Sequence, residues 1–245
     1  MAATSERNQG HDHEHEHDSE HEHEHEQGHN QGHNQGHGHG HAADRGLSGA
    51  WRYLRLLPRM WRSSVSDAVV ALIEPGRGDR LVDIGAGMGP ATVAAAKTGA
   101  IIVAVEPTPF MRGVLRARRQ LQRARQRILV IDGAAESLHI ADGTCDGAWA
   151  VNSMHHWNDV PSAIAEIHRV LRDGGRVVLV DEIFDDPSHP AFAKYGHRRT
   201  AHRHEFDEID VDSFAELMTA AGFSSATGER GTVAERPAKL VRAVK

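Results

Sequence analysis

The ten residues from Leu81 to Pro90, LVDIGAGMGP, constrain the fold more than any other part of the sequence. A short apolar run predicts a buried strand, and the glycines that follow it predict a tight turn. Pro90 suits the first turn of a helix. The free N–H groups at the start of such a helix favour an anionic ligand. The stretch therefore predicts an α/β fold that holds a nucleotide-type ligand at this turn.

Apolar strand runs and helical segments alternate from this point onward. The predicted strands are 81–84, 101–105, 128–131, 147–151 and 176–180, and the predicted helices are 65–73, 90–97, 110–126 and 162–171. Because the strand runs lack polar alternation, they predict a mostly parallel sheet with helices on both faces. A helix over 211–221 and strands near 223–229 and 238–244 predict a hairpin at the end of the sheet.

The first 44 residues differ in composition from the rest of the chain. They hold twelve of the 20 histidines, ten acidic residues and one arginine, whereas the remainder holds 27 basic and 24 acidic residues. Such a segment has too few apolar side chains to offset its ordering entropy, so we expect disorder there. We interpret the chain as a tail, 1–44, and one domain, 45–245, with a polar insertion at 182–210 on the substrate side.

Histidine and glutamate alternate within the tail, between residues 11 and 41. Imidazole and carboxylate groups are good ligands for zinc, nickel or copper. Two interpretations stay open, metal buffering or storage and a solubilising tail that takes up metal incidentally. The candidate metal ligands are His11, His13, His15, His17, His21, His23 and His25.

Composition also limits the location and the partners. Cys145 is the only cysteine, which excludes an internal disulfide framework and fits a reducing cytoplasm. The sequence contains neither a signal-like N-terminus nor an apolar run of about 20 residues, so we expect a cytoplasmic protein without a transmembrane segment. An amphipathic segment over 51–62 suits packing on its own domain or contact with a membrane surface. The arginine-rich helix near 112–127 is interpreted as a solvated face rather than a nucleic-acid site, because aromatic residues are not interleaved with it.

Other segments distinguish the type of nucleotide. Glu106 ends the second predicted strand, where an acid can accept both ribose hydroxyls. The glycines of GAGMG occupy its first, third and fifth positions, whereas the dinucleotide fingerprint places its third glycine one residue later. The segments DGAAES, 132–137, and NSMHHW, 152–157, follow the third and fourth strands. All four segments lie at carboxyl ends of strands, which predicts one connected site.

These residues resemble the class I S-adenosylmethionine-dependent methyltransferases, and most closely their small-molecule group. The resemblance covers about residues 65–182 and rests on LVDIGAGMGP, VAVEP and the block from GAAES to VLVDE. It implies a Rossmann-like open sheet of seven strands, mostly parallel with an antiparallel last strand. It also implies S-adenosylmethionine as cofactor. The cofactor-binding residues carried over are Asp83, Gly85, Ala86, Gly87, Gly89, Glu106, Pro107, Met111, Ala134, Ala135 and Asn152.

One position departs from the family pattern. Many relatives have an acid where Ala134 stands, which leaves Asp132, Glu136 or the backbone to bind the adenine amine. The resemblance therefore leaves the adenine contacts of this chain undefined.

The acceptor side of the site is less well defined by the sequence. His155 and His156 are the candidate catalytic bases, because histidine titrates in the useful range. Asp181 and Glu182 are weaker candidates, and a metal set of His197, His202, His204 and Glu205 is less favoured than a polar lid. The sequence predicts methyl transfer to a small organic acceptor. The alternatives are a metal-buffering protein with a non-catalytic nucleotide-binding domain and a nicotinamide-dependent oxidoreductase.

Overall fold

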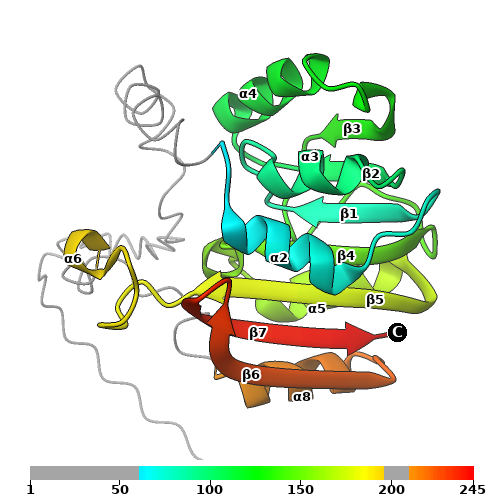
Figure 1. Ribbon diagram of the computed structural model, residues 1–245. Coiled ribbons are helices and arrows are strands. Elements are labelled where there is room, and N and C mark those ends of the chain that lie inside the picture. The colour runs from blue at the N-terminus through cyan, green and yellow to red at the C-terminus, as the bar shows by residue number, and fades with distance from the viewer. Residues whose placement is uncertain (1–60, 196–209) are drawn as a thin grey trace, which may run out of the picture. The chain divides into compact units, whose positions relative to one another are not determined.

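The computed structural model describes residues 61–195 and 210–245, which all belong to the compact unit His39–Lys245. Figure 1 shows one sheet with helices packed on it. The strands are β1 (Arg80–Ile84), β2 (Ile101–Val105), β3 (Ile128–Ile131), β4 (Cys145–Val151), β5 (Leu171–Glu182), β6 (Ser225–Val233) and β7 (Arg236–Val244). The helices are α2 (Ser64–Ile73), α3 (Pro90–Ala96), α4 (Pro109–Gln120), α5 (Val160–Val170), α6 (Phe192–Tyr195) and α8 (Val211–Ala220), with short 3₁₀ turns η2 (Arg125–Arg127) and η3 (Met154–His156).

The seven strands form a single sheet in the order β3-β2-β1-β4-β5-β7-β6. The first five strands are parallel to one another, and β7 is antiparallel to both of its neighbours. This confirms the predicted open sheet with one antiparallel final strand. The order reverses between β1 and β4, so the carboxyl ends of these strands form the crevice in which such sheets bind ligands.

Two helical layers bury the two faces of the sheet (Figure 1). The helices α2 and α3 pack on one face with Leu81, Ile102 and Trp149, and α5 and α8 pack on the other with Val82, Ala148 and other core residues. Burial on both faces explains why these strands read as continuous apolar runs in the sequence. The core is therefore one sheet covered by helices on both sides, as predicted.

The helix α4 ends earlier than the sequence suggested. The prediction extended it to residue 126, but it ends at Gln120, and the separate turn η2 covers Arg125–Arg127. Leu121 follows the last helical turn and is 76% exposed. A helix gains little from continuing when the next apolar residue finds no packing partner.

The terminal hairpin is longer than predicted. The strand β6 ends at Val233, and β7 begins at Arg236. The two residues between them, Ala234 and Glu235, have φ of 51° and 62°. Two positive φ angles in a two-residue connection match the right-handed twist of the strands. Neither residue is a glycine, so the sequence carried no turn signal there.

Within the ranges 61–195 and 210–245, no helix is long and apolar enough to cross a membrane. Most of the amphipathic segment over 51–62 lies outside these ranges. So do the tail and the larger part of the predicted insertion, and their assignments stay predictions.

Candidate donor and acceptor site

Two of the three loop glycines are required by packing. Gly85 and Gly89 have φ of 67° and 75°, which L side chains rarely adopt. A Cβ on Gly85 would lie 2.6 Å from Cβ of Ser153, and a Cβ on Gly89 would overlap Cδ1 of Leu115. Gly85 therefore lets β1 approach the segment after β4, and Gly89 lets α4 pack against the start of α3.

Gly87 is different, because a Cβ added to it would meet no atom within 4 Å. Its φ is 54°, and its N–H group donates a hydrogen bond of 2.8 Å to Oε2 of Glu106. The backbone of this one glycine thus borders open space at the carboxyl end of β1. A ligand can approach the main chain here, which is the fit that a nucleotide-type ligand requires.

Glu106 links the glycine loop to the end of β2. The residue is 5% exposed, and its second carboxylate oxygen accepts a hydrogen bond of 2.8 Å from the N–H group of Thr108. A carboxylate can accept about four hydrogen bonds, so capacity remains for ligand hydroxyls. The sequence predicted a ligand-binding acid at this position, and the structure adds that the same acid holds the loop.

Asp83 lies under the loop, next to α3. The residue is 2% exposed, and one carboxylate oxygen accepts a hydrogen bond from Oγ1 of Thr92. Burial raises the pKa of Asp83 to about 7, although Thr92 and the indole of Trp149 favour the ionised form. The side chain that the resemblance placed beside the methionine part of the ligand is thus directed to the helix.

Asp83→Asn is expected to stabilise the protein at high pH and to change little at low pH. The pKa of Asp83 is about 7 in the folded state, above the unfolded value of about 3.9. The stability contributed by the neutral acid is therefore fully present below about pH 3.9. It decreases as the pH rises from there and is lost once the pH has passed about 7. The difference amounts to about 4 kcal/mol between pH 4 and pH 8. Urea unfolding at pH 4 and pH 8 measures it, with the exposed Asp173→Asn as control. A variant that is equally destabilised at both pH values contradicts this assignment.

The turn after β3 is organised by Arg112, a residue that the sequence analysis did not single out for this role. Its Nη1 donates to the carbonyl oxygens of Glu106 and Pro107, at 2.6 and 2.9 Å, and lies 2.9 Å from Oδ1 of Asp132. Arg112 therefore ties the end of β2 to the end of β3. In the sequence, the only sign of this role is that Arg112 lies in the first turn of a helix that follows Glu106 at the end of β2.

The two acids considered for the adenine amine already have protein partners. Asp132 pairs with Arg112, and Oε1 of Glu136 accepts hydrogen bonds from the N–H groups of Asn158 and Asp159. A bridge between Ala134 and Ser137 closes the turn itself. Because a carboxylate can accept about four hydrogen bonds, both acids keep acceptor capacity, and the contact with the adenine amine stays a prediction.

The other residues expected at this end differ in exposure. Ala135 is 5% exposed and belongs to the main hydrophobic core, whereas Pro107 is exposed. Met111 is buried in the first turn of α4, and Ala86 is buried beside Leu115. Their contacts with a ligand stay predictions.

Asn152 follows β4 with φ of 52° and pairs with Glu182 at the end of β5. Its Nδ2 donates to Oε1 of Glu182 at 2.6 Å, and its Oδ1 accepts from the N–H group of Glu182 at 2.8 Å. The other oxygen of Glu182 lies 2.9 Å from Nε2 of His189 and 2.8 Å from Nη1 of Arg236. Asn152, expected to contact the cofactor, thus fixes the start of the insertion.

The ionisation of Glu182 follows from this cluster. Burial by itself would raise the pKa of Glu182, but hydrogen bonds from Arg236, His189 and Asn152 outweigh it and hold the pKa below its usual value. Glu182 is therefore a charged anchor between β4, β5, β7 and the insertion. Its oxygens serve the protein, so it is a poor candidate for a base.

His155 and Asp181 form a pair at the same end of the sheet. Nδ1 of His155 lies 2.9 Å from Oδ2 of Asp181, and the same oxygen accepts a hydrogen bond of 3.1 Å from the N–H group of His155. The side chain of Asp181 is 6% exposed and that of His155 is 27% exposed. The carboxylate thus orients the imidazole and leaves it accessible to solvent.

The structure separates the two predicted bases. The imidazole rings of His155 and His156 are 4.0 Å apart, the ring of His155 contacts the carboxylate of Asp181, and His156 is the more exposed of the two. Trp157, the next residue, is 7% exposed and packs with Phe214 in the core. His155 is therefore the better placed of the two histidines.

The metal-ligand predictions fall outside the described ranges. The tail histidines from His11 to His25 lie there, as do His197, His202, His204 and Glu205. Among the residues that the structure does describe, no group of three or more potential ligands is placed to hold a metal ion.

Comparison with known proteins shows which family this domain is similar to. The methyltransferase domain family matches residues 82–179, which span the glycine loop, Glu106 and most of β5. Over these residues the chain is similar to a methyltransferase domain. The family match leaves both the tail and the acceptor-side insertion outside its range.

Curated relatives agree with this assignment over the same region. An uncharacterized methyltransferase of Mycobacterium tuberculosis is 37% identical over 119 residues, which cover 49% of this chain and 46% of the relative. An O-methyltransferase of Pyrenophora dematioidea is 31% identical over 170 residues, covering 63% and 58%. A demethylmenaquinone methyltransferase of Corynebacterium kroppenstedtii is 28% identical, covering 55% and 52%. The chain thus spans about half the length of the curated relatives that it matches.

Solved structures show the same fold at lower identity. A putative S-adenosylmethionine-dependent methyltransferase from Methanococcus maripaludis superposes with a TM-score of 0.62 and 20% identity, covering 81% of this chain and 92% of that one. The [4+2]-cyclase SpnF gives a TM-score of 0.60 at 18% identity, covering 74% and 80%. A cyclase among these neighbours means that the methyltransferase fold alone does not decide the reaction.

Proposed function

We propose that the chain binds S-adenosylmethionine at the carboxyl ends of β1, β2 and β3 and transfers its methyl group to a small organic acceptor. The observation that carries the proposal is the joint arrangement of Gly87 and Glu106. Gly87 leaves open space beside the main chain, and Glu106 fixes that main chain with one oxygen. The family match over residues 82–179 supports the same cofactor.

The chain would hold the cofactor through main-chain contacts and through one carboxylate. The loop from Gly85 to Gly89 would surround its methionine part, Glu106 its ribose, and the backbone near Ala134 its adenine. When bound, S-adenosylmethionine supplies a methyl group on an activated sulfonium carbon. The protein mainly has to align donor and acceptor and exclude water.

His155 is the group that we assign to proton removal from the acceptor. A base is needed only if the acceptor retains its proton at neutral pH. Asp181 holds the imidazole by Nδ1, and the side chain of His155 is 27% exposed, so an acceptor can approach the ring. Oδ1 of Asp181 is buried and has no hydrogen-bond partner among the described residues. His155 is therefore part of a hydrogen-bonded pair with Asp181 on the proposed acceptor side and is not an isolated surface histidine.

The activities for which two relatives are named favour a small acceptor. One relative is an O-methyltransferase and another a demethylmenaquinone methyltransferase. We extend this class of acceptor to the present chain, together with a cytoplasmic location that fits its lone, buried and reduced Cys145. The atom that receives the methyl group is part of the test.

Calorimetry with S-adenosylhomocysteine and with NAD tests the cofactor assignment. We expect binding of S-adenosylhomocysteine and none of NAD. Glu106→Gln should weaken that binding at least about tenfold, because the amide can accept only one of the two backbone hydrogen bonds and turns an N–H group toward the other donor. Glu216→Gln, a matched exposed change on α8, should bind as the unmodified chain does. Tight NAD binding with no response to S-adenosylhomocysteine refutes the proposal.

Turnover separates an enzyme from a non-catalytic nucleotide-binding domain. Release of S-adenosylhomocysteine is measured against a panel of phenols, quinols, amines and carboxylic acids. A chain that binds the cofactor but methylates nothing in such a panel favours the metal-buffering alternative. Metal titration of the full chain and of a chain lacking residues 1–44 then measures the contribution of the tail.

A further inference from the structure

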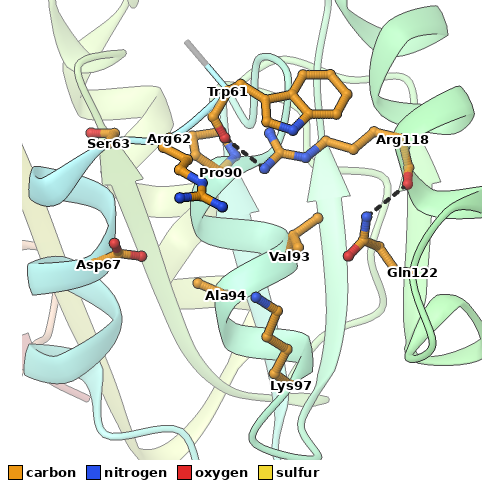
Figure 2. A pocket seen from close by; sticks show the side chains of 10 residues that line it. All are labelled: Trp61, Arg62, Ser63, Asp67, Pro90, Val93, Ala94, Lys97, Arg118 and Gln122. Atoms are coloured by element: carbon orange, nitrogen blue, oxygen red, sulfur yellow. Dashed lines mark hydrogen bonds between the residues drawn. The ribbon is translucent and has the colours of Figure 1, made fainter. Parts of the chain in front are cut away.

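A pocket lies between α2, α3 and α4, next to the end of the glycine loop (Figure 2). Its volume is about 380 Å³, within the range of about 300–1,000 Å³ that is usual for small-molecule sites. The lining residues are Trp61, Arg62, Ser63, Asp67, Pro90, Val93, Ala94, Lys97, Arg118 and Gln122. None of them has been assigned to the donor or the acceptor site.

Three cations share this pocket. Figure 2 shows that Arg62 and Lys97 extend toward the same space and that the guanidinium of Arg118 lies at its edge. Asp67 is the only acid in the lining. None of the ion pairs found in residues 61–195 and 210–245 involves Arg62, Lys97 or Arg118. The pocket is therefore strongly positive.

Arg118 is unusual because it is charged and only 6% exposed. Its Nη1 donates to the carbonyl oxygen of Met88 at 3.0 Å and its Nη2 to that of Trp61 at 2.7 Å. The guanidinium carbon lies 4.4 Å from the centre of the Trp61 indole, and Nε has no hydrogen-bond partner in the described part of the chain. Burial lowers the pKa of Arg118. A buried charge without an opposite charge is costly, and an anion in the pocket would offset that cost.

The rest of the lining suits an organic group. Pro90, Val93 and Ala94 give one wall of the pocket an apolar surface along α3. A neighbouring hollow of about 520 Å³ shares Val93, Lys97 and Gln122 with it. The combined groove can therefore hold more than an inorganic ion.

We propose that this pocket binds a phosphorylated small molecule. The dianionic phosphate would lie against Arg118, Arg62 and Lys97, because guanidinium groups bind phosphate oxygens through paired N–H donors. The organic part would lie on the apolar wall of α3. This site is separate from the proposed cofactor site and does not depend on it.

Calorimetry on the full chain tests the site, with a chelator present so that metal on the tail histidines does not capture phosphate. Phenyl phosphate is the probe, and inorganic phosphate measures the contribution of the organic part. We expect phenyl phosphate to bind more tightly than inorganic phosphate. Saturation with S-adenosylhomocysteine should not displace it, since the two sites are distinct.

Variants decide whether the named cations carry the binding. Arg62→Gln combined with Lys97→Gln should weaken phenyl phosphate binding at least about tenfold, and both changes are near the surface, so the fold should persist. Arg118→Gln should weaken it further if the variant folds, which circular dichroism monitors. Arg116→Gln, an exposed change of the same charge on the same helix, is the matched control.

Three results would overturn the proposal. One is an equal loss of affinity in Arg116→Gln and in the double variant, because binding would then reflect general charge. Another is displacement of phenyl phosphate by S-adenosylhomocysteine, which would place it in the cofactor site. The third is tight binding of a single-stranded RNA oligonucleotide that phenyl phosphate cannot displace and the double variant abolishes, because the groove would then be a polyanion site.

Discussion

Gly87→Ala is expected to fold nearly as the unmodified chain does and to lose at least about tenfold in affinity for S-adenosylhomocysteine. A Cβ at this position meets no protein atom within 4 Å, so the protein itself has room for the methyl group. The same space is where we expect the ligand to approach the main chain. The φ of 54° adds a strain of about 1–2 kcal/mol to the folded state.

Gly89→Ala is the matched change, and we expect it to destabilise the fold. Its Cβ would overlap the side chain of Leu115, a fully buried residue of α4. Overpacking and positive φ together should lower the free energy of unfolding by about 2–4 kcal/mol. Adding Leu115→Ala should relieve the overlap, so the double variant should lose less stability than the sum of the two single changes.

Urea unfolding and calorimetry on both glycine variants measure these effects separately. The expected pattern is a stable Gly87→Ala that binds weakly and a destabilised Gly89→Ala. If Gly87→Ala binds S-adenosylhomocysteine with unchanged affinity, the open space beside Gly87 is not part of the ligand site. If Gly89→Ala is as stable as the unmodified chain, the packing of α4 described above is wrong.

Asp181→Asn is expected to lower kcat by about 100-fold or more for an acceptor that must lose a proton. The carboxylate contacts both Nδ1 and the backbone N–H group of His155, and the amide cannot stabilise the imidazolium that forms when His155 takes the proton. His155→Ala should give a loss of similar size. Because the two residues act as a unit, the double variant should be little worse than either single variant.

The pH profile separates a base from a structural pair. With the unmodified chain, the rate should rise with pH as His155 becomes neutral and then level off, and this dependence should vanish in His155→Ala. Affinity for S-adenosylhomocysteine should stay unchanged in Asp181→Asn. Asp173→Asn, an exposed change of the same type, is the control. Unchanged turnover of Asp181→Asn across pH would remove His155 from the mechanism.

Much of the fold could be predicted from hydrophobic patterning. Strands buried on both faces leave continuous apolar runs, and the glycine turn after Leu81–Ile84 identified the edge of the sheet that holds the site. The end of α4 was predicted wrongly because arginine-rich sequence has good helix propensity. Its continuation depended on whether Leu121 finds a packing partner, and that is a tertiary question. The terminal hairpin was predicted, but its strands were predicted too short because Ala234 and Glu235, the two residues of the turn, carry no local turn signal.

The sequence by itself indicated which segments lie at the carboxyl edge of the sheet, since the succession of strands and helices along the chain and the glycine turn are local patterns. Only the tertiary structure decided what each polar side chain does there. It paired Asn152 with Glu182, directed Asp83 toward Thr92 and gave His155 the carboxylate of Asp181. The physical reason is that a hydrogen bond needs a partner within about 3 Å, and no periodicity encodes that distance between residues far apart in the chain. The same holds for Arg118, whose guanidinium donates to the carbonyl oxygens of Met88 and Trp61, contacts that only the three-dimensional structure shows.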